Sequence, residues 1–131
     1  RSNLPILIAE DSPLLSHLIQ DCLKRAGYSN LIVNMDGQEA WDKLEAFAKE
    51  GTLADKVKLV ITDIEMPQMD GHRLTSLLKN DDRTKDIPVI IFSSLVNEEM
   101  MRKGEALGAD AQISKPEIGK LVRIMDGLLL K

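Results

Sequence analysis

Five short apolar segments alternate with segments of helical period along this 131-residue chain, and this alternation limits the possible folds more than any other feature. Strands that are apolar on both faces and are joined by helices form a parallel sheet covered on each side. We therefore predict one α/β domain over residues 1–131, a doubly wound (βα)5 three-layer sandwich with a parallel five-stranded sheet. The predicted strands are Leu4 to Ala9, Asn30 to Met35, Val57 to Thr62, Val89 to Phe92 and Ala111 to Ser114.

The segments between these runs carry signals for the starts and ends of helices. Ser12, Asp36 and Asp70 are residue types that cap helix N-termini, and Glu39 completes a capping box with Asp36. The apolar stripe of the first helix is predicted to consist of Leu14, Leu15, Leu18, Ile19, Cys22 and Leu23. We predict five helices: from Pro13 to before Gly27, after Asp36, after Asp70, from about Asn97 to Leu107, and after Pro116.

Composition argues against several classes of function. The net charge of −4 and the aromatic fraction of 3% are unfavourable for nucleic-acid binding, which needs basic surfaces or aromatic platforms.

The chain lacks an apolar run of membrane-spanning length and a signal peptide, so we expect a cytoplasmic location. A single cysteine excludes an internal disulfide. The chain starts with Arg1 rather than Met, as expected of a domain cut from a longer protein.

Charged and hydroxyl side chains follow the predicted strands at one edge of the sheet. The strands are followed by Glu10-Asp11, Asp63, Ser93-Ser94 and Lys115-Pro116. Ligand sites of such sheets lie outside the carboxyl ends of the strands, and neighbouring carboxylates need a cation or must take up protons. Hard oxygen ligands favour Mg²⁺. Each residue alone could simply cap a helix, but together they predict a metal-supported phosphate site.

These residues resemble a known family. Glu10-Asp11, the run Asp63 to Gly71 (DIEMPQMDG), Ser93-Ser94 and Lys115-Pro116 are similar, in order and spacing, to the receiver domain of two-component response regulators. The resemblance covers nearly the whole chain. It implies a flavodoxin-like (CheY-like) fold and a signalling switch that accepts a phosphoryl group from a histidine kinase.

The resemblance also implies a role for each acidic residue. Asp63 would be the phosphoacceptor and also a ligand of Mg²⁺. Asp11 would bind the metal directly and Glu10 through water, with the backbone carbonyl of Glu65 as a further ligand. A carboxylate can attack phosphorus to give an acyl phosphate, which agrees with the role implied for Asp63.

Two further positions match groups that respond to the phosphoryl group. Ser93 matches the switch hydroxyl, and Lys115 matches the lysine that pairs with the phosphoryl group. The family commonly has an aromatic residue three positions before this lysine, whereas this chain has Gln112. The output surface implied by the resemblance consists of the fourth and fifth predicted helices and the fifth strand.

A narrower likeness concerns the segments 92–95 and 108–117. They resemble the C-terminal receiver of CheV-type chemotaxis coupling proteins. This implies a CheA-like histidine kinase as partner, and a route to the chemoreceptor array through an N-terminal CheW-like domain that the sequence does not contain. The module would not be a conventional enzyme, because its chemistry is limited to its own phosphotransfer and autodephosphorylation.

Other readings stay open at this stage. An aspartyl-phosphate hydrolase of the haloacid-dehalogenase type would carry Asp-x-Asp after an early strand, where this chain has Glu10-Asp11. The chain could be an unphosphorylated scaffold, or the receiver of a DNA-binding regulator whose output domain lies outside it. His17 and His72 have no second ligand at metal-binding spacing, so we predict that both are exposed surface histidines.

Overall fold

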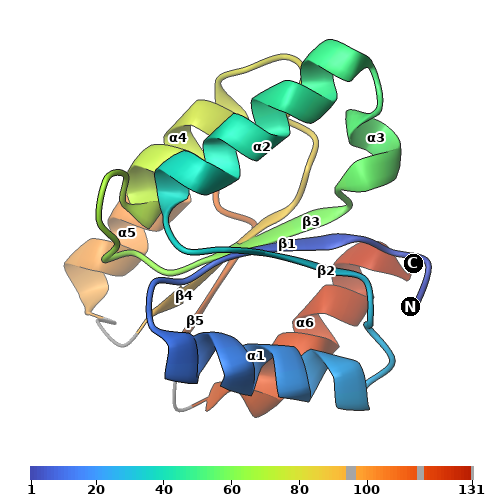
Figure 1. Cartoon of the computed structure of the whole chain (residues 1–131). Helices are drawn as coiled ribbons and strands as arrows, with labels where there is room; N and C mark the ends of the chain where they lie inside the picture. The colour runs from blue at the N-terminus through green and yellow to red at the C-terminus, as the bar shows by residue number, and fades with distance from the viewer. Residues whose placement is uncertain (94–96, 115–116, 131) are drawn as a thin grey trace.

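Five parallel strands and six helices form the computed structural model, which describes residues 1–93, 97–114 and 117–130 (Figure 1). The elements follow the predicted βα alternation. The strands are β1 (Ile6–Ala9), β2 (Leu31–Asn34), β3 (Leu59–Thr62), β4 (Val89–Ser93) and β5 (Ala111–Ser114). The helices are α1 (Pro13–Arg25), α2 (Gly37–Glu50), α3 (Leu53–Lys56), α4 (Gly71–Lys79), α5 (Glu98–Ala106) and α6 (Gly119–Leu129).

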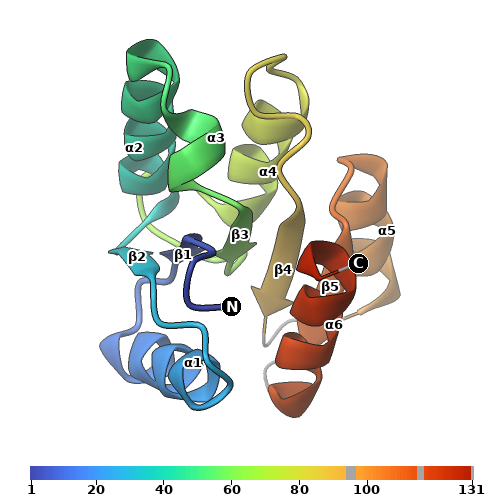
Figure 2. The ribbon, with the colours of Figure 1, turned by 90° about the vertical axis from the view of Figure 1, so that its right-hand side faces the viewer.

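The strands form one sheet in the order β2-β1-β3-β4-β5, and every neighbouring pair is parallel. Helices α1 and α6 cover one face, while α2, α4 and α5 lie on the other (Figures 1 and 2). The predicted doubly wound three-layer α/β fold is confirmed. Because β1 lies inside the sheet next to β3, the ends of these two strands meet at one edge, where the site is predicted.

Alternating side chains of the strands supply two apolar cores. In β1, Ile6 and Ile8 join the core under α1 and α6, whereas Leu7 and Ala9 join the core under α2 and α4. All four side chains are at most 1% exposed. This burial on both faces is why the strands read as continuous apolar runs in the sequence.

The predicted N-caps of α1, α2 and α4 are all confirmed. In each case the cap side chain accepts a hydrogen bond from the backbone N–H three residues later, which satisfies a donor that has no partner within the helix. The bonds are Leu15 N to Ser12 Oγ at 3.3 Å, Glu39 N to Asp36 Oδ1 at 2.8 Å and Arg73 N to Asp70 Oδ1 at 2.7 Å.

Two local predictions about helices are wrong. The short helix α3 was not expected; it forms because Leu53, 7% exposed, packs into the core under α2 and α4. The stripe of α1 is narrower than predicted, since Leu14 is 71% and Leu18 is 48% exposed. Leu18 instead lines a surface pocket with Ile118 and with Val122 of α6. Among the described residues, none of the helices combines the length and apolar character that crossing a membrane requires.

A buried tyrosine connects the end of α1 to α6. The Tyr28 side chain is fully buried, and its hydroxyl donates a hydrogen bond to Asp126 Oδ1. The Arg1 guanidinium pairs with the same carboxylate and lies over the Tyr28 ring. Burial, followed by the hydrogen bond to Asp126, raises the pKa of Tyr28 from 10.0 to about 12.

This pKa shift predicts a loss of stability in alkali. The unfolded chain releases the Tyr28 proton near pH 10, while the folded chain holds it until about pH 12. The contribution is therefore complete below pH 10 and is lost as the pH rises toward 12, by about 2 to 3 kcal/mol in total. Urea unfolding from pH 9 to 12 should show a steeper loss of stability for the parent than for a Tyr28→Phe variant. Equal slopes would contradict the prediction.

Candidate metal and phosphoryl site

The ends of three neighbouring strands bring the predicted site residues together. Glu10 directly follows β1, Asp63 directly follows β3, and Ser93 is the last residue of β4. Ala9 pairs in register with Thr62, and Thr62 pairs with Ile91, so the three strand ends are aligned. The sheet order therefore places residues that are about 30 to 50 positions apart in the chain at one edge.

Three carboxylates converge at this edge. Glu10, Asp11 and Asp63 each have a carboxylate oxygen within 4.8 Å of the other two. Glu10 is 1% exposed and Asp63 is 6% exposed, so water screens their mutual repulsion poorly. Hard oxygen donors at this spacing suit a divalent cation such as Mg²⁺ or Mn²⁺. The donor set thus fits the predicted metal.

Backbone groups fix the orientation of two of these carboxylates. Asp63 Oδ1 accepts a hydrogen bond from Ile64 N at 2.7 Å, and the Asp63 amide donates to Ala9 O at 3.0 Å. Glu10 Oε2 accepts from Ser12 N at 3.2 Å. The acidic groups are consequently positioned by the strand ends and by the start of α1.

Glycine is required where α4 begins beside Asp63. A Cβ atom on Gly71 would lie 1.8 Å from the carbonyl oxygen of Asp63. The Gly71 amide also donates a hydrogen bond to Ile64 O at 2.8 Å. No other residue allows the helix to start this close to the Asp63 backbone, so Gly71 belongs to the architecture of the site. The Asp-Gly pair that ends the DIEMPQMDG run is the sequence signal for this contact.

The loop between β3 and α4 also contacts the start of α2. Gly37 N donates to Met69 O at 3.2 Å, and a Cβ on Gly37 would lie 2.4 Å from that oxygen. Gln68 has a φ of 68°, the left-handed conformation that L-residues rarely adopt. Glu65, whose carbonyl is a predicted ligand, lies exposed in the same loop.

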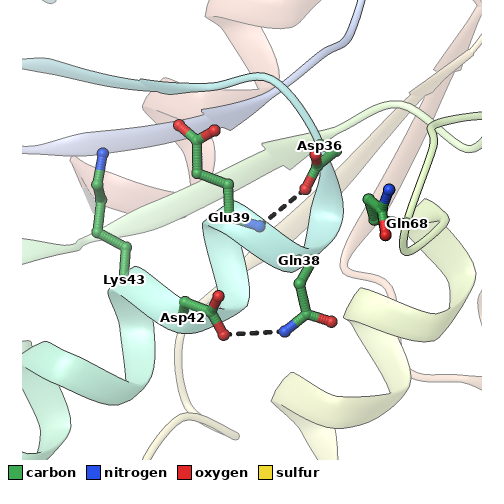
Figure 3. A pocket seen from close by; sticks show the side chains of 6 residues that line it. All are labelled: Asp36, Gln38, Glu39, Asp42, Lys43 and Gln68. Carbon is green, nitrogen blue, oxygen red and sulfur yellow. Dashed lines mark hydrogen bonds between the residues drawn. The ribbon is translucent and has the colours of Figure 1, made fainter.

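A surface pocket lies between this loop and α2 (Figure 3). Glu39 and Asp42 lie on α2, and their hydrogen bonds are local, to Asp36 and Gln38. None of the predicted site residues lines the pocket. Its lining residues are Asp36, Gln38, Glu39, Asp42, Lys43 and Gln68.

Of the predicted hydroxyl and ammonium groups, the structure describes Ser93 but not Lys115. Ser93 is 2% exposed and pairs in register with Ser114 of β5. The predicted partner Lys115 directly follows Ser114, but Lys115, Pro116 and Ser94 lie outside the described residues. The structure therefore places Ser93 next to the strand end from which Lys115 continues.

The prediction that His72 is exposed is wrong. His72 is 4% exposed in α4, and its Nε2 atom has no hydrogen-bond partner among the described residues. Helix α5 packs against α4, and this tertiary contact covers a helix position that looks peripheral in the sequence. Burial lowers the pKa of His72, and the nearby Lys103 ammonium lowers it further, whereas Asp70 raises it.

The lowered pKa of His72 predicts a loss of stability in mild acid. Below pH 6.5 the unfolded chain takes up a proton on His72 that the folded chain still resists. The free energy of unfolding then decreases as the pH is lowered, by at most about 1.4 kcal/mol per pH unit for one proton. Chemical unfolding between pH 7 and 5 should show a shallower fall for His72→Gln than for the parent. An unchanged slope would show that His72 protonates equally easily in both states.

Curated relatives include chemotaxis proteins. The chain is 31% identical over 113 residues to the chemotaxis protein CheY1 of Helicobacter pylori, covering 86% of each chain. It is also 31% identical over 128 residues to CheV3 of the same species, covering 96% of this chain and 41% of CheV3. A gliding motility regulatory protein of Myxococcus xanthus is 35% identical over 116 residues, but the chain spans only 14% of its length.

Solved structures share the fold and include metal-bound forms. The chain resembles a chain of the CheX–CheY–BeF3–Mg²⁺ complex from Borrelia burgdorferi with a TM-score of 0.83 and 26% identity, covering 98% of this chain and 90% of that one. The Mn²⁺-bound response regulator Rcp1 matches with a TM-score of 0.81 and 25% identity over 98% of this chain and 95% of that one. Residues 6–126 match the response regulator receiver domain family. The chain belongs to this family of two-component signalling modules.

Proposed function

We propose that this receiver domain is a phosphorylation-dependent switch whose phosphoacceptor is Asp63. The convergence of Glu10, Asp11 and Asp63 within 4.8 Å at the carboxyl edge of the sheet carries the proposal. Glu10, Asp11 and Asp63, with the backbone carbonyl of Glu65, would hold Mg²⁺. When bound, the metal neutralises charge on the transferring phosphoryl group.

The proposed reaction is a transfer between two nucleophiles. A carboxylate oxygen of Asp63 forms a bond to phosphorus as the bond from phosphorus to the nitrogen of a kinase histidine breaks. The product is an acyl phosphate on Asp63 and a free imidazole on the kinase. The Ser93 hydroxyl and the Lys115 ammonium would bind oxygens of the transferred group, because Ser93 ends β4 and Lys115 follows β5 in the sequence.

A chemotaxis-type pathway is the proposed context. The CheY1 and CheV3 relatives support a CheA-like histidine kinase in the cytoplasm as the phosphoryl donor. The output partner would bind the face formed by α5, β5 and α6, which are the fourth predicted helix, the fifth strand and the last helix. If the chain is part of a CheV-type protein, a CheW-like domain outside this sequence would connect it to the chemoreceptor array.

Metal-dependent labelling tests the proposal. The protein is incubated with acetyl phosphate and Mg²⁺, and the acyl phosphate is trapped by reduction and located by peptide mass spectrometry. We expect one labelled site, Asp63, and loss of labelling when EDTA replaces Mg²⁺. Labelling at another residue, or labelling that survives EDTA, would overturn the proposal. Repeated turnover of a small phosphomonoester would instead identify a hydrolase.

A further inference from the structure

The side chain of Gln112 connects β5 to α5. Its amide Nε2 donates a hydrogen bond to the carbonyl oxygen of Met101 at 2.8 Å. Gln112 itself is half-buried in β5, and Met101 is half-buried in α5. A side chain of β5 is therefore hydrogen-bonded to the backbone of α5, which covers one face of the sheet.

A glycine in α5 provides the space for this contact. A Cβ atom on Gly104 would lie 2.2 Å from Gln112 Oε1 and 2.5 Å from its Cδ. Of the nine residues of α5, all of them described, Gly104 is the only buried one. The helix thus buries little of its own surface, and the Gln112 amide hydrogen-bonds to its middle turn.

The Gln112 contact lies close to the proposed switch hydroxyl. Gln112 pairs in register with Ile91, and Ser93 pairs with Ser114 two residues further along. Because side chains alternate along a strand, Gln112 and Ser93 belong to the same face of the sheet. In the sequence, only residues 94–96 separate Ser93 from Asn97, the N-cap of α5. Gln112 thus shares a sheet face with Ser93, and Ser93 lies close in the sequence to the start of α5.

We propose that Gln112 is a hydrogen-bond latch that holds α5 in the position seen here and opposes the phosphorylated state. The inference rests on the proposed function. Phosphorylation at Asp63 would draw Ser93 toward the phosphoryl group and shift the N-terminal end of α5, while the latch resists this shift at the middle of the helix. Loss of one neutral hydrogen bond changes the equilibrium constant between the two positions of α5 by about two- to tenfold.

Hydrogen exchange of the unphosphorylated protein tests the latch itself. Gln112→Met keeps the length of the side chain but removes the donor, and we expect α5 amides to exchange about two- to tenfold faster, with β3 unchanged. Gly104→Ala is the sharper variant, because alanine favours a helix yet would displace the Gln112 amide. Faster exchange in α5 despite the better helix former supports the latch. Unchanged or slower exchange in both variants overturns it.

A matched glycine substitution controls for helix propensity. Gly127 lies in α6, and a Cβ atom there meets nothing within 4 Å. Gly127→Ala should slow exchange in α6 and leave α5 unchanged. If Gly104→Ala slows α5 in the same manner as Gly127→Ala slows α6, Gln112 does not restrain the helix.

Binding of a phosphoryl mimic tests the coupling to the site. Because the latch opposes the phosphorylated state, Gln112→Met should bind beryllium fluoride with Mg²⁺ about two- to tenfold more tightly than the parent. Faster α5 exchange with unchanged affinity would overturn the coupling and leave the proposed function intact. Failure of the parent to bind the mimic, together with failure to be labelled by acetyl phosphate, would overturn the proposed function itself and with it the coupling.

Discussion

An Asp63→Asn variant is expected to take up no phosphoryl group from acetyl phosphate or a kinase, in Mg²⁺ concentrations that fully label the parent. The amide has no carboxylate oxygen to attack phosphorus. Its carbonyl oxygen can still accept the hydrogen bond that Ile64 N donates to Asp63 Oδ1 at 2.7 Å. The substitution also removes one of three mutually repelling carboxylates, so the metal-free variant should be at least as stable as the parent.

Two controls make this result specific. Asp36→Asn changes the same functional group outside the site, and Asn is an equally good N-cap, so labelling should match that of the parent. Asp63→Glu keeps the carboxylate but moves it by one methylene group, and we expect labelling to fall sharply. Mass spectrometry measures labelling, and thermal unfolding verifies that each variant is folded. A labelled Asp63→Asn variant would place the phosphoacceptor elsewhere.

A Gly71→Ala variant is expected to lose both stability and metal affinity. The new methyl group would lie 1.8 Å from the carbonyl oxygen of Asp63, and that oxygen belongs to a backbone that cannot rotate away. The start of α4 or the end of β3 must shift, at a cost of about 1 to 3 kcal/mol or more. Because the shift moves Asp63, we also expect weaker Mg²⁺ binding than in the parent.

The matched control is a helical glycine at which an added Cβ atom would contact no other group. Gly127→Ala in α6 places a methyl group in open space, so it should stabilise the protein by about 0.5 to 1 kcal/mol. Urea unfolding measures both variants, and calorimetric titration with Mg²⁺ measures the site. A Gly71→Ala variant with the stability and the Mg²⁺ affinity of the parent would show that α4 can start elsewhere without cost.

The fold was predictable because local signals and long-range packing agree. The runs that became β1 and β3 are apolar on both faces, as required of strands covered by helices on each side. Asp36 and Asp70 cap the helices that follow them, as their residue type indicates. Once the strands are parallel, the carboxyl ends of β1 and β3 meet, which is why Glu10 and Asp63 could be assigned to one site from the sequence.

The remaining features depend on tertiary contacts that no local pattern encodes. His72 is buried because α5 packs on α4, and the neighbours of His72 in the sequence carry no trace of that contact. Leu14 has the right spacing for the core, but its side chain is 71% exposed. The sequence shows Gln112 only as a departure from the aromatic residue common in the family, whereas in the structure its amide lies against Gly104. The prediction for Lys115 is a proposal, since that residue lies outside the described part of the chain.

The pairing of Arg1 with Asp126 has a consequence for engineering. It holds Arg1 beside the last turns of α6, so the first described residues and the end of this helix lie near each other. A short linker could join them, and circular permutants opened at exposed loops become feasible. In a tandem fusion, a module attached ahead of Arg1 would emerge alongside α6. Such a neighbour could shield or present that helix simply by its attachment point.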